Sequence, residues 1–212
     1  MRVYKFMTAE FGMKSLREKR LKISLLDDLN DPFDLLPYEM RKRHIRLAFR
    51  SVTADFARIL GIICFSSSWK DPVIWAHYSD KHKGLCLAFE IPKRLGRRVR
   101  YVKKRLPFPE HQVLSSEPML FTKFANWAYE KEVRCFRNFF ESTKSAGMYF
   151  VDFGNELKLV EVIAGARCKI TESELRHAIR PLKGVKLTKA RAGFRRFEVV
   201  ENLQGFPTQP ST

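Results

Sequence analysis

Two carboxylates stand where a predicted helix changes into a predicted strand. Glu130 and Glu132 lie in the segment 123–134, and side chains two residues apart in a strand project to the same face. Such a pair can act as general acid and base, bind a metal ion or stabilise a cationic transition state. Charged residues at the end of a helix are also often simply solvated. The spacing alone therefore leaves both interpretations open.

Aromatic and imidazole side chains gather in a second segment, which begins at Trp75 and includes His77 and Tyr78. The faces of such rings suit a flat ligand ring, for example nicotinamide or a nucleobase. His77 and His82 are five residues apart, so they do not share one helix face, and a two-histidine metal site on this segment is not expected. The alternative is a helix C-terminus at which Trp75 and Tyr78 simply pack.

Cations are concentrated in two stretches of the chain. The sequence has 40 Lys and Arg against 23 Asp and Glu, a net charge of +17 that attracts polyanions such as nucleic acids. Eight of these cations lie within 93–105, and six more lie within 183–196. Cations that alternate with an aromatic ring are typical of sites that contact phosphates and stack on bases, whereas a solvated face is the alternative. The predicted nucleic-acid-binding residues are Arg97, Arg98, Arg100, Tyr101, Lys103, Lys104 and Arg105.

The elements that must position these residues are helices interleaved with many short strands. Apolar periodicity, caps and prolines predict helices near residues 8–19, 45–60, 72–78, 116–127 and 171–180. The predicted strands are 3–6, 21–24, 62–66, 84–91, 98–102, 132–136, 148–153, 157–163, 185–188 and 194–200. This order, without a repeat, predicts an α+β fold with a strongly bent, mostly antiparallel sheet and flanking helices. We expect one domain over 1–203 and a flexible C-terminal tail at 204–212.

Composition and missing motifs narrow the class of protein. The chain of 212 residues is 45% hydrophobic, which suffices for a real core. Its four cysteines are isolated, without a C-x-x-C pair, and are expected to be reduced core residues. No apolar run resembles a signal peptide or a membrane span, so we expect a cytoplasmic protein with no membrane partner. A glycine-rich phosphate loop is missing, which argues against a Walker-type nucleotidase or a Rossmann dehydrogenase.

Several motifs, taken as a set, resemble a bacterial family known as domain of unknown function 2971. They are N-D-P-F-D at 30–34, C-F-S at 64–66, W-A-H-Y at 75–78, H-K-G-L-C-L-A-F at 82–89 and K-x-x-x-W-x-Y-E-x-E-x-R at 123–134. The resemblance covers roughly the first 140 residues and continues weakly in 161–165. The family label carries no established reaction.

The order of these motifs is also similar to the ADP-ribosyltransferase superfamily. That resemblance implies an ADP-ribosyltransferase-like fold with a basic residue on the first strand, a Ser or Tyr on a second and a catalytic Glu on a later one. These roles would correspond to Arg2 or Lys5, to Ser66 and to Glu132. Two features depart from the pattern: the first-strand basic residue is ambiguous, and the chain has no Ser-Thr-Ser. Three consecutive serines, as here from Ser66, more often form a plain turn from a strand into a loop.

The second resemblance implies NAD as the co-substrate and requires no metal. Glu132 would stabilise the oxocarbenium-like charge that develops when the nicotinamide–ribose bond breaks, and Glu130 would orient or deprotonate the acceptor. A first-strand cation would pair with the pyrophosphate, and an aromatic ring would stack on nicotinamide. The predicted NAD-binding residues are Arg2, Lys5, Ser66, Trp75, His77 and Tyr78.

The leading hypothesis from the sequence is an ADP-ribosyltransferase-like enzyme that modifies a nucleic acid, as a toxin or phage-defence effector would. Such an effector implies an antitoxin or regulatory protein as a further partner. Only the charge favours a nucleic acid over a protein acceptor. One alternative is a non-catalytic nucleic-acid-binding module, and another is a metal-dependent nuclease that uses Glu130, Glu132 and His77.

Overall fold

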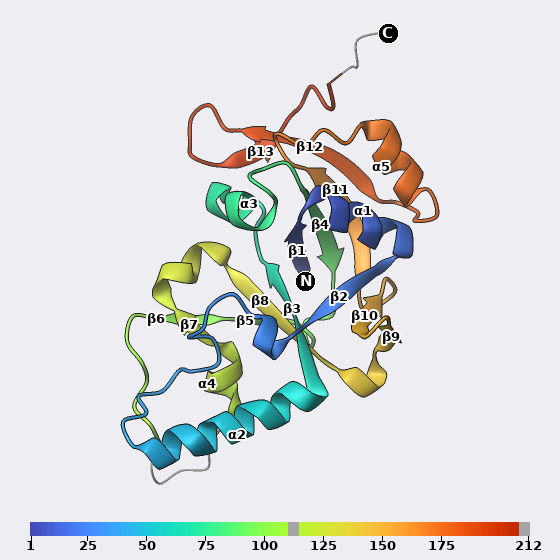
Figure 1. The fold of residues 1–212 in the computed structure, drawn as a ribbon. Helices are drawn as coiled ribbons and strands as arrows, with labels where there is room; N and C mark the ends of the chain where they lie inside the picture. Colours follow the sequence, from blue (N-terminus) through green and yellow to red (C-terminus); the bar gives the residue numbers. More distant parts are fainter. Residues whose placement is uncertain (110–114, 208–212) are drawn as a thin grey trace. The chain divides into compact units, whose positions relative to one another are not determined.

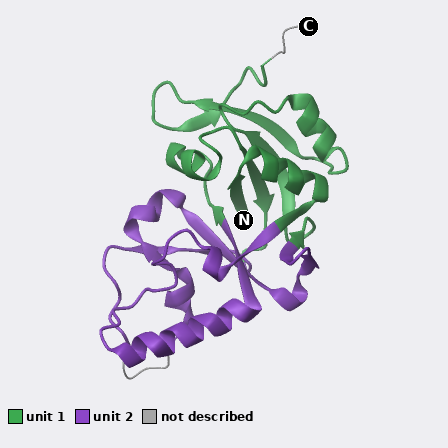
Figure 2. Cartoon of the chain, in the orientation of Figure 1, with its two compact units in different colours: residues 1–21, 65–93, 151–212 green, residues 22–64, 94–150 purple. Residues whose placement is uncertain are grey.

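The computed structural model describes residues 1–109 and 115–207 (Figure 1). Contacts divide the chain into two compact units, each built from segments distant in sequence (Figure 2). Unit 1 comprises Met1–Leu21, Phe65–Lys93 and Val151–Thr212, and unit 2 comprises Lys22–Cys64 and Arg94–Phe150. The single domain over 1–203 stays a prediction. Of the predicted tail, residues 208–212 lie outside the described ranges.

Unit 1 is a sheet with helices packed on it. Its strands follow the order β13–β12–β11–β4–β1, in which β11 and β12 pair parallel and the other neighbours pair antiparallel. Helix α1 packs against β4 and α5, and α3 packs against β1. The elements are β1 (Arg2–Met7), α1 (Ala9–Glu18), α3 (Pro72–Tyr78), β4 (Leu85–Glu90), β11 (Lys158–Ala164), α5 (Glu172–Ile179), β12 (Lys186–Ala192) and β13 (Val199–Glu201).

Local sequence explains these elements. Strand β4 is an apolar run whose residues Leu85–Phe89 are all fully buried, as expected of a central strand covered on both faces. The Thr8 hydroxyl accepts a hydrogen bond from the Phe11 amide and caps α1. The predicted capping box at the start of α5 is confirmed, since Thr171 and Glu174 satisfy each other's backbone amides.

Unit 2 combines short strand pairs with one long helix. Strands β2 and β3, β5 and β8, and β9 and β10 pair antiparallel, whereas β6 and β7 pair parallel. Strands β2, β3 and β10 each extend from one unit into the other along the chain. The elements are β2 (Arg20–Leu25), α2 (Arg43–Ile59), β3 (Leu60–Ser66), β5 (Arg97–Arg98), β6 (Arg100–Val102), α4 (Ser116–Phe121), β7 (Thr122–Phe124), β8 (Glu132–Asn138), β9 (Thr143–Ser145) and β10 (Met148–Asp152), with 3-10 helices at Leu26–Asp28, Ala125–Glu130 and Phe139–Glu141.

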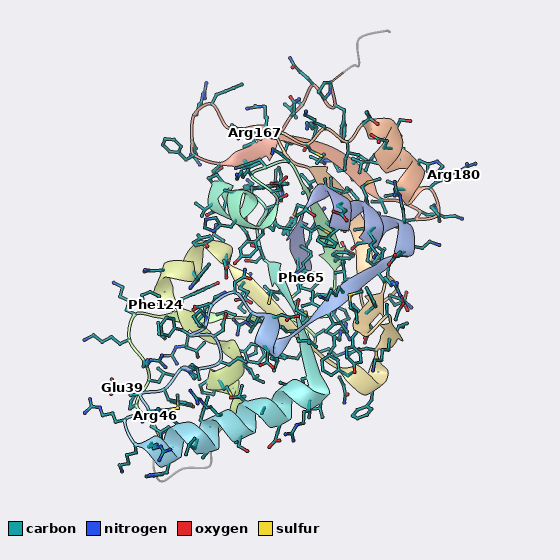
Figure 3. All side chains as sticks on the ribbon, viewed as in Figure 1. Glu39, Arg46, Phe65, Phe124, Arg167 and Arg180 are labelled. Carbon is teal, nitrogen blue, oxygen red and sulfur yellow. The ribbon has the colours of Figure 1, made fainter. Side chains whose placement is uncertain are left out.

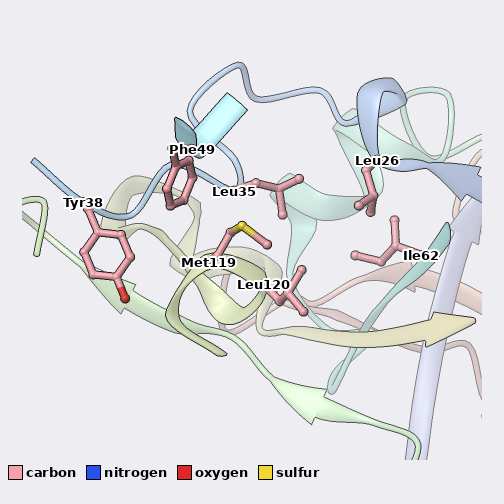
Figure 4. Packing of buried hydrophobic residues seen from close by; sticks show 7 residues of the cluster. All are labelled: Leu26, Leu35, Tyr38, Phe49, Ile62, Met119 and Leu120. Carbon is pink, nitrogen blue, oxygen red and sulfur yellow. The ribbon is translucent and has the colours of Figure 1, made fainter. Parts of the chain in front are cut away.

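The core of unit 2 gathers apolar side chains from four separate parts of the chain (Figure 4). Phe49 of α2 packs with Met119 and Leu120 of α4 and with Ile62 of β3. The segment before α2 closes the cluster with Leu26, Leu35 and Tyr38. Because these residues come from distant segments, the core fixes α4 and the following strand β7 in place.

Three elements differ from their prediction. The predicted helix over 116–127 ends at Phe121, where the chain forms β7 and then a 3-10 helix. The predicted strand over 194–200 is reduced to Val199–Glu201, since residues 193–198 form a loop. The predicted strand over 98–102 is divided into β5 (Arg97–Arg98) and β6 (Arg100–Val102).

The fold is thus α+β with a large, mostly antiparallel sheet, as predicted. The closer likeness to ADP-ribosyltransferases stays a prediction. None of the helices in the described ranges is both long and apolar enough to cross a lipid bilayer.

Candidate nucleic-acid interface

A buried cluster of charges in unit 2 holds both predicted catalytic carboxylates. The ammonium group of Lys123 donates a hydrogen bond to Glu130 Oε2 at 2.7 Å and another to Glu132 Oε2 at 3.4 Å. It also lies 3.6 Å from Asp34 Oδ2 and 4.9 Å from the centroid of the Trp127 ring. Lys123 and all three carboxylates are buried, so each charge depends on the others for stabilisation.

Arg134 is the second cation of this cluster. Its Nε lies 2.9 Å from Glu132 Oε1, and its Nη2 lies 3.1 Å from Glu132 Oε2 and 2.5 Å from Asp34 Oδ1. Its Nη1 donates to the carbonyl of Leu120 at 2.9 Å. Every nitrogen of this fully buried guanidinium therefore has an acceptor. We call Asp34, Lys123, Glu130, Glu132 and Arg134 the charge network.

Electrostatics in the charge network favour the ionised forms. Burial by itself raises the pKa of Glu132, but the neighbouring Arg134 and Lys123 hold that pKa below its ordinary value. Burial by itself lowers the pKa of Lys123, but Glu132, Asp34 and Glu130 raise it above its ordinary value. Within the network, Lys123 and Arg134 therefore favour the charged form of Glu132, and Glu132 favours the charged form of Lys123.

Glu130 and Glu132 converge through a turn, not through the alternation of a strand. Glu130 ends a 3-10 helix, Lys131 adopts the left-handed conformation with φ of 46°, and Glu132 begins β8. Both side chains nevertheless reach the Lys123 ammonium group. The two carboxylates thus meet at Lys123, but they do not share a strand face as predicted.

This arrangement bears on the catalytic role predicted for Glu132. Both carboxylate oxygens of Glu132 are engaged by Arg134, and Lys123 approaches one of them as well. Glu132 is also buried, so a ribose hydroxyl could reach its oxygens only if the surrounding side chains moved. The geometry accordingly favours a structural role, and catalysis by Glu130 and Glu132 stays a prediction.

Two of the predicted NAD-binding residues, both in unit 1, do not fit that ligand. Trp75 is fully buried, with its indole N–H donating to the Trp69 carbonyl at 2.6 Å and its ring edge-on to Phe6. Ser66 is also buried, and its hydroxyl donates to the Ser68 carbonyl at 2.8 Å, as in a turn. Neither a free ring face of Trp75 nor the Ser66 hydroxyl is open to a ribose or to nicotinamide.

The other four predicted NAD-binding residues also lie in unit 1. Arg2 forms an ion pair with the buried Glu161, and strand alternation places Arg2 and Lys5 on opposite faces of β1. His77 is exposed, and its ring meets that of Tyr78 edge-on at 6.3 Å between centroids. Since Glu130 and Glu132 belong to unit 2, a common site for these residues stays a prediction.

Across the described ranges, no group of three or more His, Cys, Asp or Glu side chains could hold a metal ion.

A cavity of about 290 Å³ lies beside the charge network within unit 2. Its lining combines aromatic and cationic side chains, including Phe33, Phe124, Lys103, Lys104 and Arg105. We call these five residues the aromatic–basic pocket.

Strands β6 and β7 explain how the chain builds this pocket. They pair in parallel register, with Tyr101 beside Lys123 and Val102 beside Phe124. Tyr101 turns inward, where its hydroxyl accepts a hydrogen bond from the Glu132 amide at 2.8 Å. Val102 and Phe124 project to the other face and line the cavity. One face of this strand pair thus contacts the charge network and the other faces the pocket.

The rings and charges of the pocket are open to solvent. Phe33 is 62% exposed and Phe124, which is labelled in Figure 3, is 45% exposed. The guanidinium of Arg105 lies 5.7 Å from the centre of the Phe33 ring and donates to the Leu36 carbonyl at 2.5 Å. Lys103 and Lys104 are exposed. Apolar rings therefore stand next to cations on one accessible surface.

The predicted nucleic-acid-binding residues divide into three groups. Lys103, Lys104 and Arg105 line the pocket, and Arg97, Arg98 and Arg100 are exposed on β5 and β6. Arg97 forms an ion pair with Glu117 and lies over the Phe121 ring. Tyr101 is different: burial raises the pKa of its hydroxyl to about 12, and its bond to the Glu132 amide makes it a positioning residue rather than a stacking surface.

The exposed rings of the pocket that sequence reasoning missed are Phe33 and Phe124. The sequence held a signal for each ring, because Phe33 lies in the N-D-P-F-D motif and Phe124 directly follows Lys123. Their proximity to residues 103–105 depends on contacts between distant segments, which spacing does not reveal.

Comparison with known proteins adds no relative, since no family model, curated protein or solved structure matches the chain. The resemblances to domain of unknown function 2971 and to ADP-ribosyltransferases therefore stay predictions.

Proposed function

We propose that this protein binds single-stranded nucleic acid through the aromatic–basic pocket of unit 2. The observation that carries this proposal is the exposure of Phe33 and Phe124 in one cavity with three exposed cations. Proteins that bind single strands combine cations for the phosphates with aromatic rings on which bases stack. A base paired in a duplex has no free face for such a ring, so a single strand is the better ligand.

The size of the pocket also favours this ligand. Cavities that enclose drug-sized ligands typically measure about 300–1,000 Å³. At about 290 Å³, this cavity suits one base or nucleotide better than a dinucleotide such as NAD. The strong positive charge of the chain would add affinity for the flanking phosphates.

The charge network has a supporting role in this proposal. Asp34 directly follows Phe33, and Lys123 directly precedes Phe124. Clamping Asp34 and Lys123 in one buried cluster holds the backbone next to both rings. Pre-ordered rings bind with a smaller entropic cost than mobile ones.

A binding assay with a labelled oligothymidylate tests the proposal. Loss of a stacked ring costs about 1–3 kcal/mol, so Phe33→Ala and Phe124→Ala should each weaken binding about 5- to 150-fold. Lys103→Ala/Lys104→Ala should reduce the slope of log K against log salt by about 1.4, at roughly 0.7 per phosphate contact. Phe140→Ala is the matched control, because Phe140 is an exposed ring of unit 2 outside the pocket. Equal affinities of the pocket variants and this control would refute the proposal.

NAD-dependent modification of the bound strand is the second candidate. The observation in its favour is that Glu130 and Glu132 both contact Lys123, which also lines the cavity. Incubation with NAD and DNA, RNA or protein should then release nicotinamide and increase the mass of the acceptor. If no nicotinamide is released with any of these three acceptors, this second candidate function is eliminated. The proposed binding of nucleic acid would not be affected by that result.

A further inference from the structure

The hairpin formed by β12 and β13 in unit 1 presents two phenylalanines at its tip. Phe194 is 89% exposed and Phe197 is 99% exposed, in the loop 193–198 that we call the hairpin tip. Burial of apolar rings drives folding, so two rings left in water on one loop call for an explanation.

The hairpin tip is held in shape by its backbone. The Gly193 amide donates to the Glu198 carbonyl, and the Glu198 amide donates to the Arg196 carbonyl, both at 2.8 Å. A Cβ atom at Gly193 would lie 2.9 Å from each of these carbonyl oxygens, so a residue without a side chain is needed there. The following Val199 amide donates to the Lys70 carbonyl at 2.7 Å. These contacts give the backbone that carries the two rings a defined shape.

Cations surround the two rings. Arg191, Arg195 and Arg196 stand in or next to the tip, against the single acidic residue Glu198. The Arg191 guanidinium lies 4.4 Å from the centre of the Phe194 ring. A cavity of about 290 Å³ runs along this surface and is lined by Phe194 and all three arginines.

We infer that the hairpin tip is a second contact surface for single-stranded nucleic acid, with bases on Phe194 and Phe197 and phosphates on the arginines. The inference rests on the proposed nucleic-acid binding and adds a contact that unit 2 does not contain. Bases in single strands stack on aromatic rings and on arginine planes alike, and the tip offers both.

The position of Arg191 favours nucleic acid over an anionic membrane. If Phe194 entered the apolar part of a bilayer, the guanidinium that lies over its ring would have to leave water with it or give up the contact, and burying a charge there is costly. Against a strand of nucleic acid the same guanidinium stays solvated and close to phosphates.

Two measurements on the full chain test the inference. The first is the affinity of Phe194→Ala/Phe197→Ala for labelled oligothymidylate, which should fall at least about tenfold relative to the wild type. The second is photocrosslinking with an oligonucleotide that carries 5-iododeoxyuridine, which should label the peptide containing the hairpin tip. Because both rings are almost fully exposed, this variant should fold normally, and Phe140→Ala again serves as the control.

The outcomes separate this inference from the proposed function. Wild-type affinity of the hairpin variant, with crosslinks only in unit 2, would overturn the hairpin contact and leave the unit 2 pocket intact. Crosslinks at the tip that persist in Phe33→Ala/Phe124→Ala would support the hairpin contact even if the pocket failed. No binding of oligothymidylate by the wild type would refute both. If Phe194→Ala/Phe197→Ala lost affinity for phosphatidylserine vesicles but kept the wild-type affinity for oligothymidylate, the hairpin contact with nucleic acid would be overturned. The partner of the hairpin tip would then be an anionic membrane.

Discussion

Arg134→Ala should strongly destabilise the protein, because it removes one of the two cations of the charge network. The guanidinium is fully buried and makes two hydrogen bonds to Glu132, one to Asp34 and one to the Leu120 carbonyl. Its removal leaves Lys123 as the only cation of the network beside three buried carboxylates.

The magnitude follows from this geometry. Breaking a buried ion pair from one side typically costs about 3–5 kcal/mol, because an uncompensated charge remains in the interior. A domain is stable by only about 5–15 kcal/mol in total. With about 2–4 °C per kcal/mol for a chain of this length, Arg134→Ala should lower Tm by about 6–20 °C.

Urea and thermal unfolding followed by circular dichroism measure this loss. The matched control is Arg176→Ala on α5, which removes an exposed i,i+4 ion pair with Glu172 and should cost less than about 0.5 kcal/mol. If Arg134→Ala loses no more than the control, the charge network contributes no stability and our account of Glu132 as a structural residue is wrong.

Three further predictions concern other parts of the fold. The pKa of Tyr101 is raised to about 12 in the folded state, so the unfolded chain releases this proton at lower pH than the folded chain does. The free energy of unfolding should therefore fall between about pH 10 and 12, and Tyr101→Phe should make that fall less steep. Gly84→Ala would place a Cβ 2.1 Å from a carbonyl oxygen of β1 and should cost about 1–3 kcal/mol in urea unfolding, whereas Gly154→Ala, with no atom within 4 Å, should be nearly neutral. Burial raises the pKa of the Cys86 thiol, so iodoacetamide should modify it slowly in the native protein and promptly in urea, and mass spectrometry of its peptide checks this.

Local patterns predicted most of the elements. The capping box of α5 and the apolar run of β4 depend on neighbouring residues only, and both are present. The segment 116–127 was different, because a helix was expected to continue where the chain turns into β7. Pairing of β7 with β6, and burial of Lys123 among carboxylates, override helix propensity there, and neither is visible in a local window.

The candidate site was harder to predict than the fold. Asp34 and Arg134 are 100 residues apart and meet at 2.5 Å. Sequence reasoning placed Glu130 and Glu132 correctly side by side but assigned them to chemistry, since their cationic partners could not be inferred from spacing. The hydrogen bonds of the pair to Lys123 and Arg134 favour a structural role, and the catalytic role stays a prediction.

Two of the motifs now have a physical explanation. All members of the charge network lie in two of the segments that carry the family resemblance, 30–34 and 123–134. These segments also contain Phe33 and Phe124, each adjacent to a network residue. A motif of acids, cations and aromatics need not encode an active site, because the same residues can form a buried clamp that fixes two exposed rings. The position of each carboxylate relative to its cation, rather than its presence in a motif, decides between catalysis and support.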